Sequence, residues 1–499
     1  MLSVRRKLPA LAVLVLGTAV AAAPAPRARP APATSLASRL DALVKLAPAP
    51  GAGRLVEARY DGVVELEAHF RKPGEKRQYR SRRRYLADGR GAVRLDWTTW
   101  LESDTTSTPE SWLFTRGTLL HRDAPDDAWR AVAADRRDLA LAQVLAGLPW
   151  EAARQLKAGL ASGALRASGS GENGVWRVAD GRSPAASALT LGGGGIVSFM
   201  TNRAHPRLGD VRDGIAYVYS PAPSEVRQVI HERDQQWSLA ERRVSFRLDV
   251  DGDTLLLLPP SFLPAEPSDS IRSAPTLSPV APGIWSVDME DLDTRSLIVE
   301  FDDRLAVLEA AVGSENGERI VDLAKRQWPS KPIRHFLFSH YHPHYAGGVR
   351  AFVAEGAMIV TTPGNEAFVR QSAAWPFRLK PDRLARSPRP LSLRTFQRRF
   401  ELADSTNRLV AVDIGARSDH TDEFVVFWFP KQRLVFETEQ GWVTVDGKLR
   451  ATRRAENFMK ALAEEGIEPD RLIQSWPMRG NRAELSRAEL DSLILARKP

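Results

Sequence analysis

The sequence of 499 residues contains no cysteine. This absence excludes disulfide bonds, a cysteine nucleophile, thiolate metal ligands and a lipid-modified N-terminal cysteine. Any metal ion must therefore be bound by His, Asp, Glu or Tyr side chains. A chain without thiols also suits an oxidising compartment.

Signatures of several other functions are missing as well. No serine stands in a Gly-x-Ser-x-Gly elbow, so serine-hydrolase chemistry has no support. The glycine-rich stretch 191–200 is followed by neither a helical pattern nor a Lys-Ser/Thr pair, and we interpret it as a turn. The net charge of +9 comes mostly from arginines spread along the chain, which predicts no nucleic-acid partner. The arginine-rich stretch 77–85 is interpreted as a solvated strand face, with contact to anionic lipid or polysaccharide as the alternative.

The N-terminus has the pattern of an export signal. Basic residues at 5–7 precede an apolar run over 8–22, and small residues at 19–23 offer cleavage sites. The apolar run is short for a membrane span. We therefore predict that residues 1–23 are a signal peptide and that the mature protein is periplasmic or secreted. Twin-arginine export and an uncleaved anchor, which would be the membrane contact, are the alternatives.

The rest of the chain divides by composition into two predicted domains. An Ala/Pro-rich tail and a short amphipathic helix occupy 24–53. Residues 54–258 alternate like strands, apart from a helical insert at 136–146, and predict a mainly antiparallel β domain such as a curved sheet or half-barrel. Seven prolines in 259–282 indicate a linker. Strands and helices alternate over 283–499, which predicts a mixed α/β or α+β domain.

A histidine-rich segment, FSHYHPHYAGG, follows a predicted apolar strand. It holds three of the nine histidines, His340, His342 and His344, at every second position. Residues two apart in an extended segment point to the same side, so His340 and His342 can reach one ion. Chemistry in α/β sheets usually lies at such strand ends. The alternative is a solvated turn without a metal.

This segment resembles the signature of the metallo-β-lactamase-fold hydrolases, His-x-His-x-Asp-His-x-Gly-Gly at the end of a buried strand. His340 lies seven positions before Gly347, the same spacing as in that signature. The resemblance implies that His340 and His342 are metal ligands. It places His344 where the family has an aspartate and Tyr345 where the family has its third histidine.

Further landmarks of the same family follow in order along 283–482. The segment ARSDHTDEFVVFWFPKQRLVFETE resembles the one that supplies the next ligand, so His420 matches a metal-binding histidine and Glu439 falls at the metal-bridging aspartate. In WPMRG, Arg479 stands in place of the final histidine ligand. The strand LAVLEA ends in Glu309, which is expected to orient a ligand without being one.

The resemblance implies an αββα sandwich with one zinc ion held by His340, His342 and His420. Three imidazoles and an open fourth position are typical of a catalytic zinc site. A second ion is not expected, because the guanidinium of Arg479 stays protonated and cannot bind a cation. The implied activity is hydrolysis of an ester, amide or similar bond in a small-molecule or polymer substrate by hydroxide from a metal-bound water.

Four residues are predicted to support that chemistry. His344 would be the general base, and Tyr345 would donate a hydrogen bond to a developing oxyanion. Arg479 would pair with Glu439 or clamp an anionic group of the substrate. Simple packing is the alternative for Tyr345, and an ion pair without further function is the alternative for Glu439.

The changes at ligand positions also allow a second interpretation. A domain that lost its second metal site can persist as a binding or scaffold protein without catalysis. Metal content distinguishes the two hypotheses, because a catalytic site retains an ion that a scaffold does not need.

Overall fold

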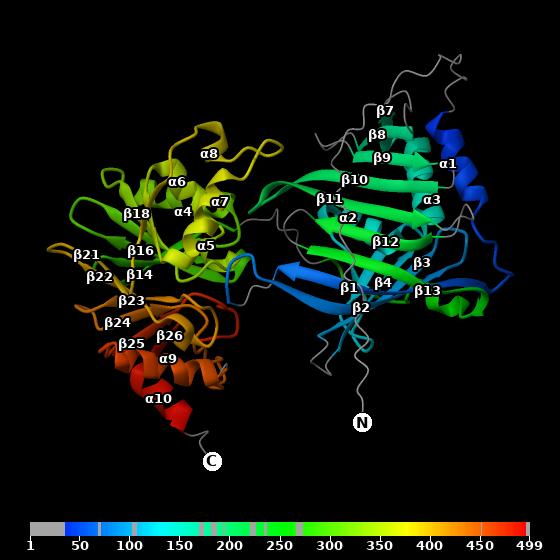
Figure 1. The fold of residues 1–499 in the computed structure, drawn as a ribbon. Coiled ribbons are helices and arrows are strands. Elements are labelled where there is room, and N and C mark those ends of the chain that lie inside the picture. Colours follow the sequence, from blue (N-terminus) through cyan, green and yellow to red (C-terminus); the bar gives the residue numbers. More distant parts are fainter. Residues whose placement is uncertain are drawn as a thin grey trace, which may run out of the picture.

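Three β-sheets organise the chain in the computed structural model (Figure 1). The structure describes residues 35–67, 71–101, 107–168, 174–180, 187–192, 195–219, 226–233, 237–265, 273–450 and 452–495. The predicted signal peptide and Ala/Pro-rich tail lie outside these ranges. Among the helices within them, none is both long enough and apolar enough to cross a bilayer.

The N-terminal part forms one antiparallel sheet of 13 strands, as its alternating pattern predicts. Two meanders join where β1 pairs with β13, so the first and last strands lie side by side at the middle of the sheet. The strands are β1 (Arg54–Glu67), β2 (Lys76–Ala87), β3 (Val93–Trp100), β4 (Ser107–Thr115), β5 (Thr118–Arg122), β6 (Arg130–Ala131), β7 (Leu165–Ser168), β8 (Val175–Asp180), β9 (Ser187–Gly192), β10 (Gly195–His205), β11 (Gly209–Tyr219), β12 (Val226–Arg233) and β13 (Trp237–Asp251).

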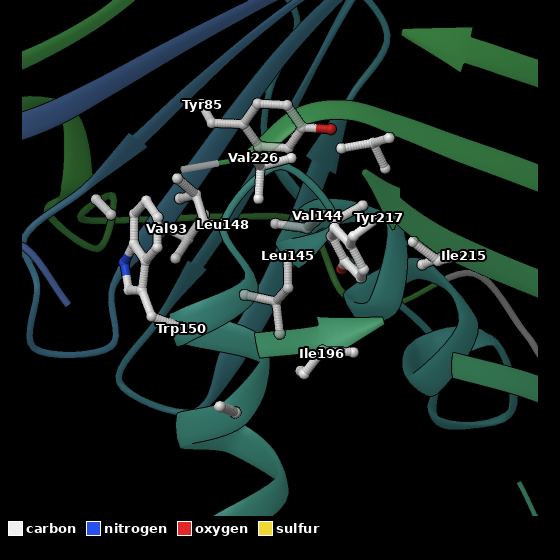
Figure 2. Close-up of a cluster of buried hydrophobic side chains, with 14 of the residues drawn as sticks. Tyr85, Val93, Val144, Leu145, Leu148, Trp150, Ile196, Ile215, Tyr217 and Val226 are labelled. Atoms are coloured by element: carbon white, nitrogen blue, oxygen red, sulfur yellow. The ribbon is translucent and has the colours of Figure 1, made fainter. Parts of the chain in front are cut away.

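Three helices pack against this sheet: α1 (Leu36–Lys45), α2 (Ala134–Leu145) and α3 (Pro149–Ala161). Val144 and Leu145 of α2 and Trp150 of α3 share one buried cluster with strand residues such as Tyr85 (Figure 2). The helix α3 was not predicted. Its signals are Pro149 at its first position and Glu151 in its first turn, both of which favour a helix start.

Two further sheets make up the C-terminal part. The seven-stranded sheet contains β14 (Thr276–Ala281), β15 (Ile284–Met289), β16 (Thr294–Glu300), β17 (Leu305–Leu308), β18 (Ile333–Leu337), β19 (Met358–Thr361) and β20 (Ser392–Thr395). The six-stranded sheet contains β21 (Arg399–Ala403), β22 (Arg408–Asp413), β23 (Val425–Phe429), β24 (Leu434–Glu437), β25 (Arg471–Gln474) and β26 (Glu484–Ser486). The strand β14 lies within the predicted linker 259–282, so the C-terminal sheet begins earlier than expected; the exact domain boundaries stay a prediction.

The C-terminal core consists of three buried clusters. One mixes residues of both sheets, such as Leu308 and Phe436, so the two sheets pack against each other there. A second joins the seven-stranded sheet to α4 (Ser314–Gln327) and α6 (Val349–Glu355). A third joins the six-stranded sheet to α9 (Thr452–Glu464) and α10 (Arg487–Leu495).

The strand β18 leads to the histidine-rich segment. It lies between β17 and β19, which are both parallel to it, and Phe336 and Leu337 are buried. The prediction extended this strand to residue 340, but it ends at Leu337. Beyond that point the Ser339 N–H donates to the carboxylate of Glu309 instead of continuing the ladder.

Candidate metal centre

Four buried side chains converge beyond the end of β18. One ligand atom from each of His340, His342, His420 and Glu439 lies within 4.8 Å of the other three. His340 and His342 follow β18, His420 follows a short 3-10 turn before β23, and Glu439 follows β24. Segments about 80 residues apart in sequence therefore meet at one point.

The turn after His342 depends on glycine. A short helix α5 (Pro343–Ala346) begins directly after His342, with proline at its first position. A Cβ atom added to Gly347 would lie 2.6 Å from the carbonyl oxygen of Pro343 and 2.7 Å from Val312. The chain can turn this tightly behind the histidines because glycine has no side chain.

Local hydrogen bonds hold the loop that carries His420. The Ser418 hydroxyl accepts the N–H of His420 at 3.2 Å and donates to the Thr421 carbonyl at 3.2 Å. The Asp413 carboxylate accepts the N–H groups of Gly415 and Phe424, each at 2.9 Å. The position of the His420 ring is thus set by polar contacts on both sides of the loop.

The nitrogen positions fit a tetrahedral cation. His342 Nδ1 and His420 Nε2 are 3.2 Å apart. Two nitrogens, each roughly 2.0–2.1 Å from one tetrahedral ion, would be separated by roughly 3.3 Å. His340 Nε2 is buried, has no hydrogen-bond partner among the described residues, and lies 3.9 Å from Glu439 Oε1. These atoms are therefore placed so that they could hold one cation together.

The neighbouring Ser339 orients the ring of His340. Its Nδ1 lies 2.9 Å from the Ser339 hydroxyl, which leaves Nε2 directed at the cluster. The N–H of Ser339 is in turn accepted by Glu309 at 2.9 Å. Burial raises the pKa of Glu309 well above its usual range, which favours the neutral carboxyl. Glu309 reaches the cluster through Ser339, consistent with an orienting role.

Glu439 is an anion held by three partners. Tyr345 donates its hydroxyl to Oε1 at 2.8 Å, while Arg454 and His420 lie 3.2 Å and 3.0 Å from Oε2. Burial alone would raise the pKa of Glu439, but contacts with His342 and His420 hold it well below the usual range. Burial also lowers the pKa values of His340 and His342, which favours the neutral imidazoles that bind metals.

His344 and Arg479 lie outside the four-residue group. The ring of His344 stacks on Trp476 with centroids 4.5 Å apart. Arg479 is exposed, and its guanidinium donates to the Glu290 carbonyl at 2.7 Å. Asp293 fixes this loop by accepting the N–H of Arg479 at 2.6 Å. Arg479 therefore does not form the ion pair with Glu439 that the sequence suggested.

Arg454 of α9 forms the ion pair with Glu439 instead. Sequence reasoning missed this residue, because nothing in the local pattern of α9 shows that its first turn faces a carboxylate 15 residues earlier in the chain. Tyr345, predicted to face the substrate, is fully buried and contacts Glu439. The centre thus consists of three imidazoles, one carboxylate, and a tyrosine and an arginine that hold the carboxylate.

Comparisons with known proteins give similarity in structure alone. No protein-family model and no curated protein matches the chain. Among solved structures, a metallo-β-lactamase from Pontibacter korlensis is 14% identical, with 45% of this chain and 100% of that chain covered and a TM-score of 0.33. The metallo-β-lactamase FIM-1 from Pseudomonas aeruginosa, in its mono-zinc form, is 18% identical over 45% of this chain and 96% of its own, with a TM-score of 0.34. The sec-alkylsulfatase Pisa1 from Pseudomonas sp. is 16% identical over 44% of this chain and 41% of its own, with a TM-score of 0.31, so the similarity covers less than half of this chain.

Proposed function

We propose that this protein is a metal-dependent hydrolase whose C-terminal part has the αββα sandwich of the metallo-β-lactamase fold. A single divalent cation would be held by His340, His342 and His420. The observation that carries this proposal is the convergence of three imidazole nitrogens and one carboxylate at a buried point. Such a costly concentration of buried polar groups is explained by a ligand that all four can share.

Zinc is the cation that we propose. Imidazole and carboxylate are common zinc ligands, and the chain has no thiolate that would favour another metal. When bound, the cation would act as a Lewis acid and lower the pKa of a water molecule towards neutrality. A second cation is not part of the proposal, because His344 and Arg479 lie outside the group.

The protein groups would position and deprotonate the attacking water. Glu439 is an anion beside the three imidazoles, so it can accept the proton of that water as a general base. Tyr345 and Arg454 keep its two oxygens in place. This arrangement supports Glu439 rather than His344 as the base, since His344 stacks on Trp476.

A second candidate function is a metal-binding protein without catalysis. Glu439 has oxygens 3.0 to 3.9 Å from nitrogens of all three histidines. It could therefore complete a four-ligand shell and leave no open position, which is the arrangement of structural zinc sites. In that case the centre would stabilise a scaffold.

Metal content and turnover together test the two candidates. Purified protein should contain one zinc per chain, and His340→Ala and His420→Ala should abolish both the zinc and the hydrolysis of para-nitrophenyl esters and anilides. His335→Gln is the matched control, since His335 lies on β18 outside the ligand group. Stoichiometric zinc without turnover of any ester, amide or sulfate ester would favour the scaffold. Protein that contains no zinc and gains none on dialysis against zinc would refute both.

Export belongs to the same proposal. The pattern of residues 1–23 supports cleavage after the small residues at 19–23 and release into the periplasm or medium. Expression of the full chain in a Gram-negative host, followed by N-terminal sequencing of the periplasmic fraction, tests it. Protein that remains in the cytoplasm with its first residues intact would contradict export.

A further inference from the structure

A pocket of about 430 Å³ lies beside the contact between the N-terminal sheet and the C-terminal part. Its lining comes from α6, from the end of α7 (Glu366–Ala374), from α8 (Arg383–Arg386) and from the loops that flank α8. Small-molecule sites usually enclose about 300–1,000 Å³ and often lie where two domains meet. The size and the place of this pocket therefore suit a small-molecule ligand.

The N-terminal sheet holds one wall of the pocket. In the turn between β10 and β11, the N–H of Asp210 donates to the Pro376 carbonyl at 2.6 Å. The Asp210 carboxylate accepts the N–H groups of Arg378 and Leu379 at 2.9 to 3.1 Å. In Figure 1 the ends of β10 and β11 extend towards the C-terminal part. Because Pro376 and Arg378 both line the pocket, this contact between the two parts of the chain fixes its wall.

A buried ion pair supports the inner side of the pocket. Arg350 donates to both carboxylate oxygens of Asp382, at 2.6 and 3.1 Å, and to the carbonyls of Ala373 and Trp375, at 2.7 and 3.1 Å. Its guanidinium carbon lies 4.2 Å from the centre of the Phe377 ring. These partners occupy the guanidinium, so Arg350 shapes the pocket without offering its charge to a ligand.

Apolar side chains form most of the remaining lining. Phe377 and Leu384 are buried, and Trp375 is half-buried. Three prolines complete this surface: Pro376, Pro381 and Pro388. Aromatic rings pack well against such flat apolar groups, and a ring that enters the pocket would be removed from water.

Two arginines stand at the open side of the pocket. Arg378 and Arg389 belong to its lining, and both are exposed. Within the described ranges of the chain, the guanidinium of Arg378 has neither a hydrogen-bond nor an ion-pair partner. Arg389 makes one long hydrogen bond, 3.4 Å, to the Glu355 carbonyl. Both cations are therefore available to a ligand.

The acids near the pocket do not cancel this charge. No acidic residue belongs to the lining. Asp382 is neutralised by Arg350, and Asp210 is the one acid that contacts the wall from outside. Two available arginines against one carboxylate leave a single excess positive charge, which favours a ligand with one negative charge.

Packed aromatic rings separate the pocket from the metal centre. The ring of Trp375 lies 6.3 Å from that of Phe368, which lies 6.0 Å from that of Tyr341. Tyr341 in turn lies 4.9 Å from the ring of His342, with all distances measured between ring centres. A ligand in the pocket would thus have these rings between itself and the four residues of the centre.

We propose that this pocket binds a small aromatic monoanion, such as an aryl carboxylate, at a site of its own. The ring of the ligand would pack against Trp375 and Phe377, while Arg378 and Arg389 would bind its anionic group. Arginine suits both tasks, because its planar guanidinium binds carboxylates through paired hydrogen bonds and stacks on aromatic rings. This binding function goes beyond the proposed hydrolysis and does not depend on it.

Calorimetric titration of the full-length protein with para-phenylbenzoate tests the site. The neutral para-phenylbenzamide should bind about tenfold more weakly, because it lacks the charge that the arginines recognise. Decanoate should also bind about tenfold more weakly, because a flexible chain loses conformational freedom in the pocket. Equal affinity for the amide would refute the anion site, and equal affinity for decanoate would refute the aromatic preference. No binding of para-phenylbenzoate at millimolar concentration would refute the pocket as a binding site.

Two variants place the ligand in this pocket. The double variant Arg378→Gln with Arg389→Gln should lower the affinity for para-phenylbenzoate by about tenfold. Ala385→Trp, at an exposed position of the lining, should fill the pocket and lower it as much. Arg334→Gln and Ala374→Trp are the matched controls, since both residues are exposed and lie outside the lining, and their affinity should stay within about twofold. Unchanged affinity in the arginine variant, or an equal loss in the controls, would overturn the proposal.

A variant without the metal centre separates this inference from the proposed function, because a carboxylate can also bind a metal ion. His420→Ala should bind para-phenylbenzoate as tightly as the wild type. Loss of binding in His420→Ala would assign the ligand to the metal centre and refute the pocket site. If no ester is hydrolysed but binding depends on Arg378 and Arg389, the pocket site stands and the hydrolase proposal fails.

Discussion

The Tyr345 hydroxyl donates a 2.8 Å hydrogen bond to Glu439, and both side chains are buried beside the three histidines. A bond of this kind orients the carboxylate without contacting the ion itself. Residues that orient the charged groups around a metal ion in this way are usually needed for full metal affinity, whether or not the oriented group binds the ion itself.

Tyr345→Phe should therefore weaken zinc binding while the fold remains. Loss of the hydroxyl removes one of the three partners of Glu439, and we expect about a tenfold lower zinc affinity. Competition with a fluorescent chelator measures it. Tyr219→Phe is the control, since it removes a hydroxyl that donates to the Ile196 carbonyl at 2.7 Å in the N-terminal sheet. Equal zinc affinity in wild type and Tyr345→Phe would contradict the orienting role.

Removal of the metal should destabilise the C-terminal part. A ligand that binds only the folded state, at about a hundred times its Kd, adds about 2.7 kcal/mol to the free energy of unfolding. A strong chelator should accordingly lower the Tm of the wild type and leave the Tm of His420→Ala almost unchanged. Scanning calorimetry with and without chelator gives both values. If the chelator does not change the Tm of the wild type, the protein does not hold a structural or catalytic ion.

The Arg350–Asp382 pair should make stability depend on pH. Arg350 donates to both carboxylate oxygens, at 2.6 and 3.1 Å, and both residues are buried. Burial raises the pKa of Asp382, but hydrogen bonds from Arg350 and Ser314 outweigh it, so the net shift is downward. A lowered carboxyl pKa stabilises the fold above the pKa of the unfolded chain, and this contribution is lost as the pH falls through the folded pKa.

Asp382→Asn should thus lower the free energy of unfolding most at neutral pH. We expect a loss of about 3 kcal/mol there, because Arg350 would keep a buried charge without its anion. The difference from the wild type should shrink as the pH falls below the pKa of an ordinary aspartate, because Asp382 of the wild type loses its charge as the pH falls through its lowered pKa. Urea unfolding at several pH values measures it. A difference that is constant across this range would show that the ion pair does not contribute.

Gly209→Ala should loosen the contact between the two parts of the chain. Gly209 has φ +73°, and an added Cβ would lie 2.0 Å from the Pro376 carbonyl oxygen. Gly163→Ala is the matched control, since Gly163 also has φ +73° but nothing within 4 Å of the added atom. Alanine in this backbone conformation should lower the free energy of unfolding of both variants by about 1 kcal/mol. Only Gly209→Ala should be destabilised further, by a steric clash. Faster proteolysis between residues 258 and 275 in Gly209→Ala alone would report the loosened contact.

The alternation of apolar residues over 54–258 predicted the antiparallel sheet of the N-terminal part. The segment LAVLEA, interpreted as a strand, contains β17. The helix α3 was not predicted, although Pro149 at its first position favours a helix start. The strand β14 was missed because its prolines suggested a linker, yet Pro279 is accommodated in this edge strand.

The residues of the metal centre differ in how far sequence could place them. His340 and His342 are close in sequence, so an extended segment brings them together without any knowledge of the fold. The position of His420 beside them depends on the packing of two sheets and came from the family resemblance alone. Arg454 contacts Glu439 from a distant segment, and a single sequence contains no signal for such a contact.

The turn between β1 and β2, where the Arg71 carbonyl accepts the N–H of Asp422 at 3.0 Å, has a consequence for any fragment of this protein. An excised C-terminal piece beginning near residue 273 would retain all four residues of the centre. It would, however, leave the N–H of Asp422, the N–H of Ser314 and the carbonyl of Pro376 to be solvated by water, since their partners lie in the removed half. Metal uptake by such a piece would measure the ligands alone, and only the intact chain would present them with their neighbours in place.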